Sequence, residues 1–300
     1  MLDSFPVKQT PALGLGTVQF GRDYGVSNPA GQVPLSVVRR LMEVAAGHEI
    51  RFLDTAMLYG TSESVLGEAL AAGHRFEIVT KTPVFGHDPD PSDADRAREA
   101  AERSFERLRA SRLYGLLAHD ADDLLRPGGD RLYGVLRDLR DEGRIRKIGA
   151  SVYDGRQIDA LLDRYRIDLI QLPLNVFDQR LIGSGHLARL VENGVEAHVR
   201  SAFLQGALLM APGDLPPRLE ALRAHLEAFE RSAAAAGVSR LDAALGFLRT
   251  QPVDVVLVGV TAEAELRQII ESWRLPIPAL DFGALALHND DLLNPSRWNG

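Results

Sequence analysis

The chain contains no cysteine, and this absence removes several classes of chemistry. Disulfide bonds, thiolate metal sites and thiol nucleophiles are excluded. The first ten residues, MLDSFPVKQT, lack the charged and apolar regions of a secretory signal, so we expect a cytoplasmic protein. No apolar run approaches the ~20 residues that cross a bilayer, and no membrane segment is predicted.

An excess of positive charge is also missing. The 34 Lys and Arg residues are outnumbered by 41 Asp and Glu, giving a net charge of -7, and no basic cluster stands out. A nucleic-acid partner is not expected, because binding phosphate backbones requires such a cluster. The histidines are scattered, and GHEIR does not have the spacing of a zinc hydrolase motif, so we predict no metal site. What remains is the composition of a globular chain.

Short apolar runs alternate with segments of helical periodicity along the whole chain. Strands are predicted at 13–17, 50–54, 76–81, 113–119, 145–151, 168–174, 195–200 and 253–259. Helices are predicted at 35–46, 62–72, 92–110, 130–142, 155–164, 181–192, 216–236, 239–249 and 262–272. Ser92 is the expected N-cap of the third helix, and Gly73, Gly143, Gly194 and Gly237 stand where helices should end.

Eight strand–helix units in 300 residues favour a (β/α)8 TIM barrel, with a doubly wound sheet as the alternative. No linker divides the chain. We therefore expect one domain over residues 1–300, with substrate loops and a C-terminal tail over the face where the strands end.

Polar residues collect at the predicted strand ends, which is where TIM barrels carry their active sites. Asp54, Lys81, His119, Ser151 and Arg200 each close a strand. Because side chains alternate along a strand, an inward His119 predicts that Leu117 and Leu113 also face inward.

Tyr59 follows Asp54 by five positions. An ammonium of Lys81 between this carboxylate and the phenol would lower the pKa of Tyr59 and make it a general acid. Each residue also has a simpler interpretation: Asp54 as a turn residue, Lys81 as a side chain that reaches solvent, His119 as a structural histidine. A barrel aldolase that uses Lys81 as a Schiff-base amine is another alternative.

The sequence resembles the aldo-keto reductase superfamily over nearly its whole length. The matching segments, in order, are LGLGTVQFG, FLDTAMLYGTSESVLGEAL, VTKTPV, LLAHDADDLL, GRIRKIGASVYD, DLIQLPLN and VLVGVTAEAELRQII. The start LGTVQFGRDYG is similar to that of a bacterial subgroup of these enzymes.

The resemblance implies an NAD(P)H-dependent oxidoreductase that interconverts a carbonyl and an alcohol. It implies a catalytic tetrad of Asp54, Tyr59, Lys81 and His119, in which Tyr59 protonates the carbonyl oxygen. The implied cofactor contacts are Ser151 and Gln171 at the carboxamide, Arg200, Ser201, Phe203, Gln205 and Gly206 after the seventh strand, and Gly259, Val260, Thr261 and Glu265 at the last helix.

Three positions depart from the family pattern. Val152 stands where the family often has an asparagine that binds the carboxamide, and Arg200 stands where many members stack an aromatic ring on the nicotinamide. A guanidinium can also stack, but it disfavours the oxidised, positively charged ring. Glu265 stands where NADP-preferring members have arginine, which favours NAD, although Arg267 nearby would favour NADP.

The loops over the predicted active-site face are rich in Arg, Asp, Asn and His, so we expect a small, polar, sugar-like carbonyl or alcohol substrate. Tyr24, Phe85 and Trp298 are the expected aromatic floor of its pocket. The alternative function is a nicotinamide-binding regulatory or redox-sensing barrel with little turnover. Nothing in the sequence indicates an oligomeric state.

Overall fold

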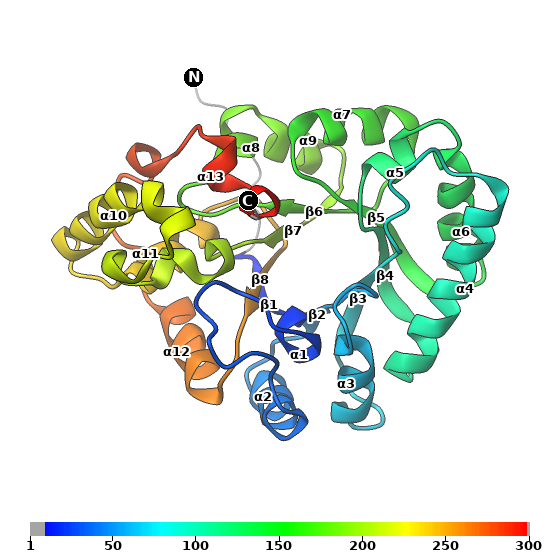
Figure 1. The fold of residues 1–300 in the computed structure, drawn as a ribbon, viewed down its shortest axis with the longest axis horizontal. Helices are drawn as coiled ribbons and strands as arrows, with labels where there is room; N and C mark the ends of the chain where they lie inside the picture. The colour runs from blue at the N-terminus through cyan, green and yellow to red at the C-terminus, as the bar shows by residue number, and fades with distance from the viewer. Residues whose placement is uncertain (1–9, 299–300) are drawn as a thin grey trace.

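Eight parallel strands form a closed barrel in sequence order, with β1 paired to β8, in a computed structural model that describes residues 10–298. The strands are β1 (Ala12–Gly16), β2 (Phe52–Asp54), β3 (Glu77–Lys81), β4 (Leu113–Ala118), β5 (Ile145–Ser151), β6 (Leu169–Pro173), β7 (Glu196–Arg200) and β8 (Val255–Gly259). Figure 1 shows the helices surrounding them. The (β/α)8 TIM barrel is thereby confirmed, and the doubly wound alternative is wrong.

The helices that cover the barrel agree with the predicted periodicity. They are α2 (Leu35–Gly47), α3 (Ser62–Ala69), α4 (Pro91–Leu108), α6 (Gly129–Asp141), α7 (Gly155–Arg164), α9 (His186–Glu192), α10 (Arg223–Ala235), α11 (Arg240–Arg249) and α12 (Glu263–Arg274). Shorter ones are α1 (Val18–Gly21), α5 (Asp122–Leu125), α8 (Arg180–Gly183) and α13 (Asp290–Leu293). None of the helices in residues 10–298 has the length and apolar content needed to cross a membrane.

Three of the predicted helices begin or divide differently from the prediction, each for a local reason. Ser92 is not the N-cap of α4: the Asp90 carboxylate accepts the Ser92 and Asp93 N–H groups at 2.7 and 3.2 Å, and Pro91 occupies the first turn. The predicted helix 181–192 is split into α8 and α9 at Gly185, whose φ is +79°. The predicted helix 216–236 begins as a 3₁₀ turn, Pro217–Leu222, and becomes α-helical only at Arg223.

Glycines with positive φ follow three of the helices as expected. Gly143, Gly194 and Gly237 come after α6, α9 and α10 with φ of +73°, +65° and +72°. Gly73, with φ of +76°, lies in a turn beyond α3, which already ends at Ala69.

The barrel interior is narrow and partly polar. Val79, Leu117 and Leu169 form a small inner cluster, and Tyr114 packs against it, while Leu113 belongs to the larger core shared with the helices. The prediction that Leu113 faces inward is therefore wrong. An inward side chain at position 149 is also impossible, because a Cβ on Gly149 would meet Leu117 Cδ2 at 2.5 Å.

A hydrogen-bonded cluster lies near the amino-terminal ends of the strands. The Glu196 carboxylate accepts from Tyr114, Lys147 and the buried His198. Although burial raises the pKa of Glu196, these bonds outweigh it and hold that pKa at about 2. This arrangement fills the mouth opposite the predicted active site with paired charges.

Candidate active site

A cavity of about 950 Å³ opens at the carboxyl ends of the strands. Its lining includes Gln171 from the middle of β6 and the last residues of five strands, Gly16, Asp54, Ser151, Arg200 and Gly259. From the C-terminal segment, Asn294, Pro295 and Trp298 line the cavity. Among residues 10–298, no cluster of His, Asp and Glu has the arrangement of a metal site.

Asp54, Lys81 and Tyr59 converge at the base of the cavity. The Lys81 Nζ atom lies 2.6 Å from Asp54 Oδ1, 3.0 Å from the Thr55 carbonyl and 3.4 Å from the Tyr59 hydroxyl. The side chains of Lys81 and Asp54 are only 1% and 7% exposed. The register explains the contact, because Asp54 pairs with Val79 and β3 continues two residues further to Lys81.

Close packing below Tyr59 fixes the turn that carries it. A Cβ on Gly21 would meet the Tyr59 carbonyl at 1.8 Å, so only glycine fits there. The Thr17 N–H and hydroxyl both donate to the Asp54 carbonyl, at 2.9 and 2.8 Å, and Ser62 donates to the Thr17 carbonyl at 2.8 Å. Sequence reasoning missed these three supporting residues, since Thr, Ser and Gly are common in turns of any kind.

His119 lies at the edge of the Tyr59 ring, with the ring centroids 5.8 Å apart and the planes at 84°. Burial, together with the charges of Lys81 and Arg200, lowers the pKa of His119 to about 3, so its imidazole is neutral at physiological pH. Its buried Nδ1 atom has no hydrogen-bond partner within residues 10–298.

The predicted lowering of the Tyr59 pKa is wrong for the resting site. Burial and then the Asp54 charge raise the pKa of Tyr59, and Arg200 opposes them. The Lys81 ammonium closes on Asp54, at 2.6 Å, rather than on the phenol at 3.4 Å. The Asp54 carboxylate therefore offsets most of the lowering of the Tyr59 pKa that the Lys81 ammonium could cause.

Ser151 and Gln171 lie side by side on β5 and β6 and both line the cavity. Gln171 Nε2 donates to Asp54 Oδ1 at 2.7 Å, whereas its buried Oε1 atom has no partner among the described residues. An open amide acceptor at this place fits a carboxamide N–H donor. Val152 is fully buried outside the cavity lining, so it offers no replacement for the asparagine of the family pattern.

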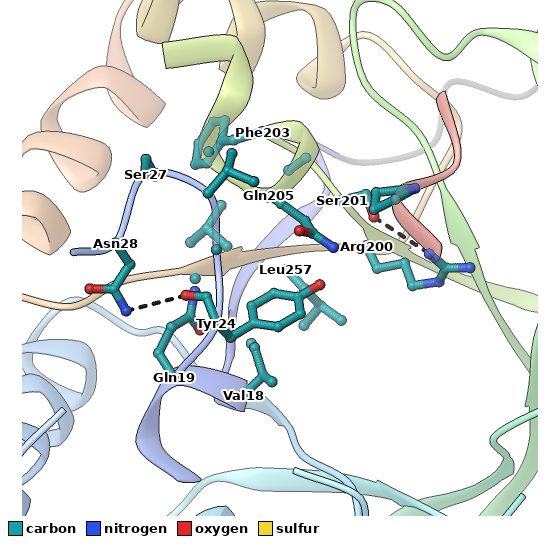
Figure 2. A pocket seen from close by; sticks show the side chains of 18 of the residues that line it. Val18, Gln19, Tyr24, Ser27, Asn28, Arg200, Ser201, Phe203, Gln205 and Leu257 are labelled. Atoms are coloured by element: carbon teal, nitrogen blue, oxygen red, sulfur yellow. Dashed lines mark hydrogen bonds between the residues drawn. The ribbon is translucent and has the colours of Figure 1, made fainter. Parts of the chain in front are cut away.

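Arg200 reaches across the end of β7. Its guanidinium donates to the Val152 carbonyl at 2.9 Å and to the Ser201 hydroxyl at 3.4 Å, and it stacks on the Tyr153 ring at 4.4 Å (Figure 2 shows Arg200 and Ser201). Tyr153 also lines the cavity and was missed from the sequence. Tyr153 directly follows Val152, which departs from the family pattern, and this position is the signal in the sequence that could have identified Tyr153.

The loop after β7 is built from unusual backbone conformations. Ser201, Leu204 and Gln205 have φ of +59°, +49° and +54°, and Gly206 has +94°. Such conformations in non-glycine residues gather at functional sites. The predicted residues Ser201, Phe203, Gln205 and Gly206 all line the cavity, and the Gln205 carbonyl accepts the Val26 N–H at 3.0 Å from the loop after β1.

Glu265 closes the start of α12. Its carboxylate accepts the Thr261 and Ala262 N–H groups at 2.7 and 3.3 Å and the Thr261 hydroxyl at 3.0 Å. Gly259, Thr261 and Glu265 line the cavity, while Val260 is buried behind it. Arg267 points elsewhere, because its guanidinium lies 2.7 Å from the Glu263 carboxylate.

Two of the three predicted aromatic residues lie in the cavity. Figure 2 shows the Tyr24 ring among Val18, Leu257 and Gln205, and burial of its hydroxyl raises the pKa of Tyr24 to about 12. Trp298 is buried in the lining.

Phe85 does not line the cavity. Its N–H donates to the Asp123 carboxylate at 2.9 Å, and its ring lies under the Arg96 guanidinium at 5.4 Å, within the helix layer.

The model of the aldo/keto reductase family matches residues 12–290. The chain belongs to this family. It is 27% identical to the 6-dehydroglucose reductase of Novosphingobium aromaticivorans, over 82% of this chain and 83% of the relative. It is also 27% identical to the NADH-specific methylglyoxal reductase of Escherichia coli, over 65% and 64% of the two chains.

Solved aldo-keto reductase structures share the fold. The holo form of an aldo-keto reductase from Bacillus halodurans has a TM-score of 0.73 at 21% identity, covering 97% of this chain and 98% of the other. The glycerol dehydrogenase of Gluconobacter oxydans has a TM-score of 0.70 at 23% identity, covering 96% and 93%. As a member of the aldo/keto reductase family, the protein is an oxidoreductase that interconverts carbonyls and alcohols with a nicotinamide cofactor.

Proposed function

We propose that this aldo-keto reductase reduces a small, polar, sugar-like carbonyl and that Tyr59 is its general acid and base. The observation that supports this most strongly is the convergence of Tyr59, Lys81 and Asp54 at the base of one cavity, with Lys81 Nζ 3.4 Å from the phenol oxygen. The 6-dehydroglucose reductase among its relatives supports a sugar-like substrate. The proposed location of the protein is the cytoplasm, as expected from the sequence.

The cofactor supplies the hydride when it is bound. Ser151 and the open Oε1 of Gln171 would hold its carboxamide, and the free face of Arg200 would lie against its ring. The contacts predicted at Gly259, Val260 and Thr261 stay a proposal for the phosphate. The Thr261 N–H already donates to Glu265, so it would be shared between that carboxylate and the phosphate.

Proton transfer is carried by the chain itself. The raised pKa of Tyr59 keeps the phenol protonated at neutral pH, ready to donate. As the proton leaves, negative charge develops 3.4 Å from the Lys81 ammonium, which stabilises it. His119 is neutral and lies beside the same ring, so it can direct a hydrogen bond to the carbonyl oxygen without repelling Lys81.

Replacing Tyr59 by phenylalanine tests this assignment. Tyr59→Phe removes the transferable proton but keeps the ring, so kcat should fall by about 10²-fold or more while NADH binding is retained. Initial rates on a panel of aldehydes and sugars, with fluorescence titration of NADH as the control, make the comparison. An unchanged kcat would refute the role of Tyr59. Binding of NADH by the natural chain without turnover of any carbonyl would favour the regulatory alternative.

A further inference from the structure

Arg200 combines restraint with free hydrogen-bonding capacity. Two bonds, to the Val152 carbonyl and the Ser201 hydroxyl, and the stack on Tyr153 hold the guanidinium in place. An arginine has five N–H donors, and these bonds occupy two of them. The side chain is part of the cavity lining (Figure 2). A fixed guanidinium with donors to spare is therefore available to whatever enters the cavity.

Arg200 has no counter-ion in the part of the chain that the structure describes, residues 10–298. The cavity carboxylates are held elsewhere. Asp54 bonds Lys81 and Gln171, and Glu265 bonds the start of α12. The third, Asp23, lies against Gly31. The positive charge of Arg200 is left for a ligand to neutralise.

The charge lies beside the catalytic groups. Arg200 lowers the pKa of both Tyr59 and His119, whereas Arg22 and Arg218, the other cavity arginines, contribute to neither shift. Lys81 and Asp54 offset each other and His119 is neutral. Among the cations that act on Tyr59 or His119, Arg200 is therefore the one without a carboxylate partner in residues 10–298.

We propose that Arg200 binds an anionic group of the substrate, a carboxylate or a phosphate carried close to the carbonyl. This inference rests on the proposed function and narrows its substrate class to acidic or phosphorylated aldehydes and ketones. The planar guanidinium matches either anion with two parallel N–H bonds, and its contact with the Tyr153 ring and its two hydrogen bonds restrain it. The same guanidinium can stack on the nicotinamide with its face and bind the anion with its edge.

Two matched substrate pairs test the proposal: 2-hydroxy-3-oxopropanoate against D-glyceraldehyde for a carboxylate, and D-glyceraldehyde 3-phosphate against D-glyceraldehyde for a phosphate. The natural enzyme should favour the charged member of at least one pair in kcat/KM by about tenfold or more. The pair that shows the preference distinguishes carboxylate from phosphate. Arg200→Gln should bring that ratio close to one, chiefly through KM, and Arg200→Lys should retain part of it. Both members of a pair are measured with the same cofactor. Any effect of Arg200→Gln on cofactor binding therefore cancels in the ratio of their kcat/KM values.

Arg22→Gln is the matched control, since it removes a cavity cation that does not act on Tyr59 or His119. It should leave the ratio unchanged. If kcat/KM is the same for the charged and the neutral member of both pairs, the proposal is wrong. It is also wrong if Arg22→Gln lowers the ratio as much as Arg200→Gln does.

A binding measurement gives the answer without turnover and so separates this inference from the proposed function. Calorimetry of the NADH-bound enzyme should show tighter binding of D-glycerate, or of glycerol 3-phosphate, than of glycerol. Arg200→Gln should abolish the difference. If neither anion binds more tightly than its neutral partner, Arg200 does not receive the substrate's charge, whatever the enzyme reduces.

Discussion

Lys81 and Asp54 form a buried ion pair whose effect on stability can be separated from its proposed role in the chemistry. The Lys81 side chain is 1% exposed, and burial lowers its pKa while Asp54 raises it. Neither charge is stable at this depth without the other. The pair is therefore sensitive to the loss of one partner and tolerant of losing both.

Single and double substitutions should separate these two contributions. Lys81→Met leaves the Asp54 carboxylate without its ammonium, and we expect the free energy of unfolding to fall by about 3–5 kcal/mol. Adding Asp54→Asn should recover most of that loss without restoring kcat. Urea denaturation and initial rates on the three variants measure both effects. A double variant no more stable than Lys81→Met would contradict this account.

Sequence reasoning located the side chains that we propose as catalytic, but not their electrostatics. Asp54, Lys81 and His119 were identified because strand ends of a TIM barrel meet at one face, and Tyr59 because it follows Asp54. Whether Lys81 acts more on Tyr59 or on Asp54 depends on a difference between 3.4 and 2.6 Å, which no sequence pattern contains. The partnership of Arg200 with Tyr153 likewise depends on how two loops meet.

Among secondary-structure elements, the strands and most helices were predicted because hydrophobic periodicity records which face is buried. The errors fall where short-range chemistry overrides periodicity. Pro91 begins α4 with Asp90 as its N-cap, Gly185 divides α8 from α9, and Pro217 turns the beginning of a helix into a 3₁₀ segment. Such positions are decided by one or two residues rather than by a repeating pattern.

The start of α12 carries the prediction on cofactor preference. Glu265 places a carboxylate in the cavity lining, and Glu263 holds Arg267 at 2.7 Å. A carboxylate repels a 2′-phosphate and suits a ribose diol. We therefore expect a lower dissociation constant for NADH than for NADPH, measured by fluorescence titration. The reverse order would refute the role given to Glu265.

A variant of the same helix sharpens this test. Glu263→Gln releases Arg267 without altering the cavity lining, and it should strengthen NADPH binding severalfold while leaving NADH binding unchanged. Glu271→Gln, further along α12 and also outside the lining, is the control and should change neither constant.

The barrel taken together separates two kinds of charged site. The amino-terminal mouth contains the Glu196 cluster, in which every charge has a partner, and the carboxyl-terminal mouth contains Arg200, which has none in residues 10–298. Because the paired charges at the amino-terminal mouth stabilise the barrel, the carboxyl-terminal mouth can carry groups whose pKa values are shifted.

The stability of the barrel should depend on pH through His119. Its pKa is about 3 when folded, below the 6.5 of the free imidazole, so the unfolded chain binds a proton that the folded chain does not. The sign follows: stability is complete above pH 6.5 and falls as the pH drops from 6.5 toward 3. Thermal unfolding across this range should show a shallower decline in His119→Asn. An identical slope in the variant would contradict the shifted pKa.

Gln171 bonds the Asp54 carboxylate through its amide nitrogen and presents its oxygen to the cavity. In the proposed mechanism, this one planar amide connects the groups that transfer the proton with the site that would hold the nicotinamide. The two ends of the amide cannot change independently. Turning it over would place the oxygen against the Asp54 carboxylate and the NH₂ group toward the cavity.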